Sequence, residues 1–131
     1  MPDAVIVSAC RTAIGTARKG TLVDVSAFDL ATAAVREALG RSGVDPADVD
    51  DVVLGEVLQG GGDIARWAAI ESGLVHVPGV AHNRHCASGM AAVQTAAGSI
   101  RAGMDRVVIA GGTESISSMP MATRQIGRAH V

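Results

Sequence analysis

AHNRHCASGMAAVQTAAGSIRAG, residues 81–103, is the stretch that decides how this chain is organised. A short extended run over residues 79–83 leads to Cys86, where the sequence predicts that a long helix begins. Small apolar side chains lie on every side of this predicted helix, and such a helix is normally buried and closely packed. They are Ala87, Ala91, Ala92, Ala96, Ala97 and Ala102.

Cys86 is the candidate catalytic residue. The first N–H groups of a helix have no partner within the helix, and they favour negative charge. A thiol at that position ionises more readily than a free thiol, and the thiolate is the reactive nucleophile. Position alone leaves a second interpretation open, a buried structural cysteine without reactivity. Cys10 lies close behind a predicted buried strand, where packing is the simpler role.

Length and composition limit the classes of protein to which the chain can belong. Its 131 residues are enough for one domain with its own core, but not for two ordinary ones. A single Phe, a single Trp and no Tyr argue against stacking platforms for nucleic acid. The formal charge of -2, with both signs interspersed, offers no basic face for nucleic acid or for a membrane.

The sequence also favours a soluble protein of the cytoplasm. Its N-terminal segment contains Asp3 and only a short apolar run, which does not fit a signal peptide. No stretch approaches the length of a membrane span. Two cysteines far apart in the sequence do not make a disulfide framework.

The hydrophobic pattern alternates between strand and helix along the chain. Apolar β-branched runs predict strands, and apolar faces framed by capping residues predict helices. The predicted strands cover residues 4–9, 51–58, 79–83 and 106–110. The predicted helices begin at or just after Ser26, Asp63 and Cys86, and the first of them ends at Gly43. This alternation implies an α/β layered fold, βαβαβαβ, with a mostly parallel sheet and right-handed crossovers.

No metal or cofactor site is predicted. His82 and His85 lie near Cys86, but the alternation of a strand would send the two imidazoles to opposite faces. Residues 110–113, AGGT, follow a strand but lack the spacing of a dinucleotide or phosphate loop. Since the adjacent side chains of His85 and Cys86 diverge, a base for the thiol is expected from elsewhere in the fold.

Several motifs of the sequence resemble the thiolase family, in its order and with its spacing. The motifs are residues 4–9 with 11–15, residues 62–69, residues 83–90 (NRHCASGM) and residues 110–117 (AGGTESIS). Ala13 stands where the family usually has proline, and Trp67 is unusual at its position. Neither departure touches the chemistry.

The resemblance implies acyl transfer through a thioester on Cys86. In thiolases the matching cysteine attacks an acyl-coenzyme A and holds the acyl group, and a second acyl-CoA, deprotonated at its α-carbon, then attacks it in a Claisen condensation. Coenzyme A as the nucleophile gives the reverse cleavage of a 3-ketoacyl-CoA. The backbone N–H of Cys86 is expected to help stabilise the developing oxyanion. Coenzyme A thioesters are substrates here, and no separate cofactor is implied.

The resemblance also implies the surroundings of this chain. The family fold has five layers, made of two similar α/β halves with a loop domain inserted in the first, and the proteins are commonly homodimers or homotetramers. This chain resembles the first half only. The activating histidines and the second, acid–base cysteine belong to later motifs. A later strand completes the first half's sheet, so residues 106–110 are expected at an open apolar edge.

The expected domain boundaries follow from the same resemblance. Residues 1–119 are expected to be an incomplete thiolase N-terminal domain, and residues 120–125 the start of the loop domain. Residues 126–131, IGRAHV, match the translation of a widely used sequencing-adapter read and are expected to be a non-native tail. The chain by itself is expected to fold poorly and to be inactive toward acyl-CoA.

Two other functions stay open at this point. A condensing enzyme of the ketoacyl synthase type would share the fold and the nucleophile but take acyl carrier protein, and the forms of residues 83–89 and 111–117 favour a thiolase over it. A non-catalytic domain would use the fold for binding or dimerisation. The intact Cys86 argues against that reading, and the rate of thiol labelling at neutral pH would separate the two.

Overall fold

The structure, a computed structural model, describes residues 3–59 and 62–119. The expected start of the loop domain at residues 120–125 and the expected non-native tail at 126–131 both lie outside the described residues. Among the described residues, no helix combines the length and the apolar character that crossing a bilayer requires.

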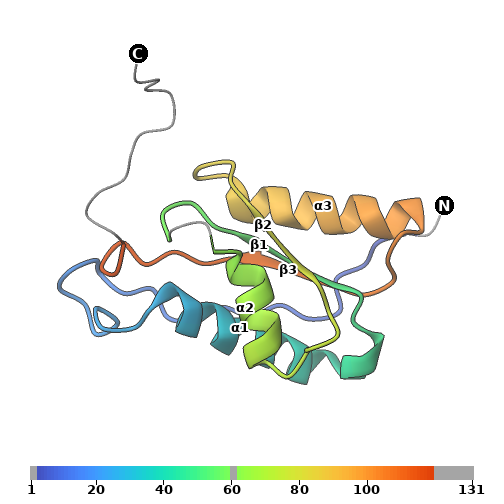
Figure 1. The fold of residues 1–131 in the computed structure, drawn as a ribbon, viewed down its shortest axis with the longest axis horizontal. Helices are drawn as coiled ribbons and strands as arrows, with labels where there is room; N and C mark the ends of the chain where they lie inside the picture. Colours follow the sequence, from blue (N-terminus) through green and yellow to red (C-terminus); the bar gives the residue numbers. More distant parts are fainter. Residues whose placement is uncertain (1–2, 60–61, 120–131) are drawn as a thin grey trace, which may run out of the picture.

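A three-stranded parallel sheet forms the middle layer of the fold, in the order β2-β1-β3. Strand β1 (Asp51–Gly55) pairs with β2 (Gly79–His82) on one side and with β3 (Val108–Gly112) on the other. Helices α1 (Ala27–Ser42) and α2 (Ile64–Glu71) lie on one face of the sheet, and α3 (Ser88–Ala102) covers the other (Figure 1). The predicted α/β layered fold with a parallel sheet is confirmed.

Local capping explains where α1 begins and ends. The Ser26 hydroxyl accepts a hydrogen bond from the backbone N–H of Asp29 at 3.1 Å and donates to the Asp29 carboxylate at 2.6 Å. Gly43 ends the helix in the left-handed conformation, with φ of 71°. Both ends agree with the sequence prediction, because caps of this kind are encoded within a few residues. The short 3-10 helix η1 (Pro46–Asp48) follows, capped by Asp45.

Two carboxylates hold the start of α2. Asp63 accepts a hydrogen bond from the backbone N–H of Arg66 at 3.2 Å, as the capping prediction requires. The buried Glu56, which follows β1, accepts a second one from the backbone N–H of Ile64 at 3.0 Å. Because Glu56 directly follows the last residue of β1, this hydrogen bond connects the start of α2 to the end of the central strand.

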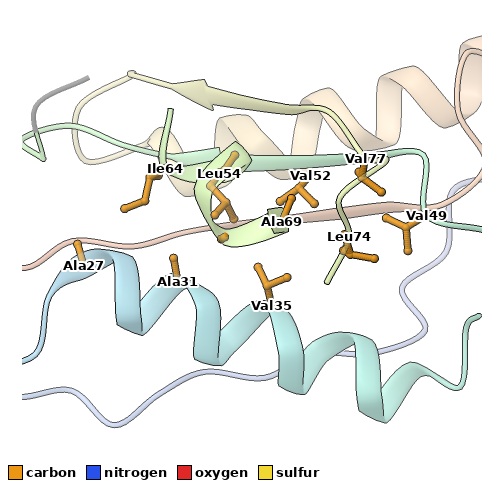
Figure 2. Close-up of a cluster of buried hydrophobic side chains, with 12 residues drawn as sticks. Ala27, Ala31, Val35, Val49, Val52, Leu54, Ile64, Ala69, Leu74 and Val77 are labelled. Carbon is orange, nitrogen blue, oxygen red and sulfur yellow. The ribbon is translucent and has the colours of Figure 1, made fainter. Parts of the chain in front are cut away.

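The hydrophobic core lies between the sheet and the pair α1 and α2 (Figure 2). Side chains from the sheet, from both helices and from the connecting loops meet there: Val52 and Leu54, Ala27, Ala31 and Val35, Ile64, Ala65, Ala68 and Ala69, and Val49, Leu74 and Val77. Phe28 packs edge-on against Trp67, with ring centroids 5.3 Å apart. Trp67, unusual by comparison with the family pattern, therefore joins α1 to α2.

The prediction of a strand at residues 4–9 is wrong for this structure. The segment is irregular, and Val5, Ile6 and Val7 are 73%, 81% and 64% exposed. A strand needs a neighbour for its backbone hydrogen bonds, and a groove of about 740 Å³ lies between this segment, α1 and the outer edge of β3. Among the described residues, β3 pairs on one side only, so the expected open apolar edge is confirmed.

The last strand lies two residues later than predicted and runs through two glycines. Gly112 passes so close to α3 that an added Cβ would meet the Gly89 Cα at 3.3 Å and the Gly55 Cα at 3.5 Å. A Cβ on Gly55 would lie 2.8 Å from the Gly89 nitrogen. We call this meeting of Gly55, Gly89 and Gly112 the glycine contact. It seats the N-terminus of α3 directly on the ends of β1 and β3.

Replacing Gly55 with alanine should destabilise the protein by about 1–3 kcal/mol, because backbone atoms of α3 would have to give way. Gly40→Ala is the matched control: Gly40 lies within α1 with nothing within 4 Å of an added Cβ. It should stabilise the protein by about 0.5–1 kcal/mol through helix propensity. Urea unfolding measures both changes, and equal effects of the two substitutions would contradict the close approach.

Adjacent aspartates at the start of β1, Asp50 just before the strand and Asp51 as its first residue, have opposite pKa shifts. The Asp50 carboxylate accepts hydrogen bonds from the backbone N–H groups of Val107 at 3.0 Å and Arg106 at 2.6 Å, and these bonds lower the pKa of Asp50. Burial raises the pKa of Asp51. A hydrogen bond from the Val52 N–H at 2.7 Å lowers it, but by less than burial raises it. The Asp50 bonds fix the approach of the chain to β3.

Asp50→Asn should lower the free energy of unfolding at neutral pH. The folded pKa lies below the unfolded value of about 3.9, so the stabilisation is present above that pH and is lost as pH falls through the folded pKa. Asp51→Asn should act in the opposite sense, since a raised pKa means that ionised Asp51 destabilises the fold. Urea unfolding across acid and neutral pH tests both. Two substitutions that shift stability in the same direction at neutral pH would refute this assignment.

Candidate active site

Cys86 lies in the turn that joins β2 to α3, at the carboxyl end of the parallel sheet. Its side chain is exposed, so a substrate can reach the thiol. A buried structural cysteine does not fit this exposure. The carboxyl ends of parallel strands are also where ligands bind in open α/β sheets.

Helix α3 begins at Ser88, two residues later than the sequence predicts. Tight turns precede it: the N–H of Ala87 donates to the Arg84 carbonyl at 3.1 Å, and that of Ser88 donates to the His85 carbonyl at 3.0 Å. Cys86 therefore lies just before the N-cap residue, Ala87, and not within the helix. It remains next to the first N–H groups of α3, which lack partners within the helix.

The N-terminus of α3 has no side-chain cap, unlike those of the other helices described. Ser26, Asp45 and Asp63 cap α1, η1 and α2, whereas Ala87 at the start of α3 makes no such hydrogen bond. A capping oxygen would occupy the N–H groups of the first turn. The Ser88 N–H already donates to the His85 carbonyl, but no side-chain oxygen caps the rest of the first turn, so the positive end of the helix dipole beside Cys86 favours negative charge.

The turn that carries Cys86 contains a strained residue. His85 has φ of 50°, in the left-handed region, which costs a non-glycine residue about 1–2 kcal/mol. The Asn83 side chain accepts a hydrogen bond from the His85 N–H at 3.1 Å. An asparagine bonded to the backbone two residues on is a common turn-forming device.

Ser88 closes the same turn from inside. Its side-chain oxygen accepts a hydrogen bond from the Arg84 N–H at 2.8 Å and donates one to the His85 carbonyl at 2.7 Å. The residue is 4% exposed, at the point where α3 meets Gly55. The backbone before Cys86 is thus joined to the first residue of α3.

Loops after β1 and β3 meet at the same edge of the sheet. The Gln59 side-chain amide donates to the Glu114 carboxylate and, at 3.3 Å, to the Ser115 carbonyl. The Thr113 hydroxyl donates to the Ala27 carbonyl at the start of α1, at 3.0 Å. The segment after β3 is therefore fixed between the β1 loop and α1.

Cys10 packs against α1, away from the turn that carries Cys86. The Cys10 thiol donates to the Ala34 carbonyl of α1 at 3.3 Å and is partly buried. Across residues 3–59 and 62–119, His82 and His85 belong to no group of three or more possible metal ligands.

Sequence reasoning found Cys86 but not the residues that hold its turn. Asn83, two positions before His85, gave a readable turn signal. Ser88 gave none, because its bonds exist only once the turn has closed. The contact of Gln59 with Glu114 joins loops 55 residues apart, which no local pattern reveals.

Comparison with known proteins gives a consistent result. The family model described as thiolase, N-terminal domain, matches residues 4–131. The acetyl-CoA acetyltransferase of Cupriavidus necator is 44% identical over 92% of this chain and 31% of its own length. The 3-ketoacyl-CoA thiolase of Bacillus subtilis is 39% identical over 92% of this chain and 32% of its own length.

Solved structures show the same relationship in space. The acetyl-CoA acetyltransferase of Bacillus anthracis superposes with a TM-score of 0.88 at 39% identity, covering 98% of this chain and 34% of that one. A thiolase of Ascaris suum in complex with coenzyme A gives 0.88 at 33% identity, covering 98% and 35%. The chain thus spans about a third of the length of these relatives. With the fold, the motif around Cys86 and the match over residues 4–131 in agreement, the chain belongs to the thiolase family.

Proposed function

We propose that Cys86 accepts the acyl group of an acyl-coenzyme A, within a thiolase-type acyltransferase that forms or cleaves 3-ketoacyl-CoA. The observation that carries this proposal is an exposed thiol beside the uncapped N-terminus of α3, in a chain of the thiolase family. Relatives named as acetyl-CoA acetyltransferases, and a related thiolase in complex with coenzyme A, support acyl-CoA as the substrate class.

In the proposed first step, the Cys86 thiolate attacks the carbonyl carbon of the acyl thioester. A bond forms between this carbon and the Cys86 sulfur, and the bond to the coenzyme A sulfur breaks. The departing coenzyme A sulfur takes the electron pair and leaves as a thiolate, and the proton that the Cys86 thiol lost on ionising can then protonate it. Negative charge develops on the carbonyl oxygen in between, and N–H groups at a helix N-terminus stabilise such charge.

The second step needs a base that we place outside this chain's described residues. Removing a proton from the α-carbon of a second acyl-CoA requires a positioned acceptor. His85 is adjacent to Cys86 in sequence, but it is exposed and its backbone has the left-handed conformation of the turn. We propose that the later histidines and second cysteine implied by the family resemblance supply this chemistry in the full-length protein.

We further propose a cytoplasmic homodimer or homotetramer. A nucleophilic thiol must stay reduced, and reducing compartments keep exposed cysteines in that state. Several apolar side chains of α3 are exposed here, including Met90 and Val93, which supports coverage of this face by other parts of the assembled protein.

Cys86→Ser in the full-length protein should abolish the acyl intermediate and lower turnover by on the order of 10³-fold or more, because a hydroxyl ionises far less readily than a thiol. The measurement is mass spectrometry of peptides after incubation with acetyl-CoA. Cys10→Ser is the matched control and should leave acylation unchanged. Acyl groups on Cys10 with none on Cys86 would refute the proposal.

A further inference from the structure

We infer that Ser88 is a positioning residue for Cys86, whose side-chain hydroxyl sets where the thiol lies relative to the first turn of α3. The inference rests on the proposed role of Cys86 as the acylated residue. It concerns how the turn of residues 83–87 is held and not the chemistry of the thiol itself.

The Ser88 hydroxyl bonds to both residues that precede Cys86. It accepts from the Arg84 N–H at 2.8 Å and donates to the His85 carbonyl at 2.7 Å. The same carbonyl accepts the Ser88 backbone N–H at 3.0 Å. One buried side chain therefore fixes both the Arg84 N–H and the His85 carbonyl, in the backbone just before Cys86.

The turn needs this support because His85 is strained. Its φ of 50° is a conformation that non-glycine residues keep only where surrounding contacts impose it. Asn83 contributes one hydrogen bond to the exposed side of the turn, and Ser88 contributes two from the buried side. Without the hydroxyl, the His85 peptide can relax toward a more common conformation and move Cys86 with it.

Ser88 is itself fixed by the sheet. An added Cβ on Gly55 would lie 2.8 Å from the Ser88 Cβ and 2.8 Å from its carbonyl carbon. The glycine contact thus holds Ser88 in place, and Ser88 in turn holds the backbone before Cys86. The position of the thiol is linked in this way to the central strand.

The test is Ser88→Ala in the full-length protein, with two rates measured on Cys86. Acylation by acetyl-CoA requires the sulfur to be correctly placed relative to the helix N–H groups. Its rate should fall by about 10–100-fold, because small displacements of a reacting atom slow a reaction by that much. Alkylation by iodoacetamide needs only an ionised, accessible thiol. At each pH, the alkylation rate of Ser88→Ala should therefore differ from that of the wild type by less than about threefold. A purely structural role would not separate the two rates.

Ser99→Ala is the matched control. Ser99 lies on the same helix, and its hydroxyl hydrogen-bonds the Asp105 carboxylate at the far end, so losing it should leave both rates unchanged. Ser88→Thr keeps a hydroxyl and should recover most of the acylation rate.

His85→Gly provides the second background, because glycine adopts positive φ without strain. In this background, Ser88→Ala should still slow acylation, but by a smaller factor than when His85 is present. The alkylation rate should again be unchanged. If Ser88→Ala alone gives no folded protein, this double variant compared with His85→Gly decides the question.

Unchanged acylation in folded Ser88→Ala would overturn the inference, and so would a parallel fall in both rates or an equal loss in both backgrounds. A wild-type protein that is never acylated on Cys86 would instead refute the proposed function. The two failures are therefore distinguishable.

Discussion

The glycine contact controls how closely α3 approaches the central sheet. With hydrogen in place of a side chain at Gly55 and Gly112, the backbone of α3 at Gly89 lies directly on the ends of β1 and β3. Interiors are packed densely enough that one added methyl group must displace its neighbours. The contact therefore sets the distance between helix and sheet at the end where Cys86 lies.

The site combines this support with a turn that is organised locally. Asn83 and Ser88 bind the backbone around His85, and the exposed Cys86 lies between these two residues in the chain. Side-chain oxygens cap the other helices described, but not α3. A helix N-terminus without a side-chain cap favours negative charge beside it, which supports the proposed role of Cys86.

The groove between residues 4–17 and β3 is the other prominent feature of the fold. It is lined by apolar side chains of the N-terminal segment, of α1 and of α3, and by the open edge of β3. Val5, Ile6 and Val7 face solvent although their sequence is typical of a buried strand. A strand-forming sequence gains its hydrogen bonds only from a partner strand, and none of the described strands pairs with this segment, which is irregular.

Helix boundaries that depend on neighbouring residues could be predicted from the amino-acid sequence. Ser26, Gly43 and Asp63 placed the ends of α1 and the start of α2 because caps act within one helical turn. The motif around Cys86 identified the candidate nucleophile and the family. The tertiary structure alone decided the rest. It carried β3 through Gly111 and Gly112, moved the start of α3 to Ser88, and left residues 4–9 without a partner strand among the residues that the structure describes. Those outcomes depend on contacts between segments far apart in the chain, and no local pattern of residues encodes such distances.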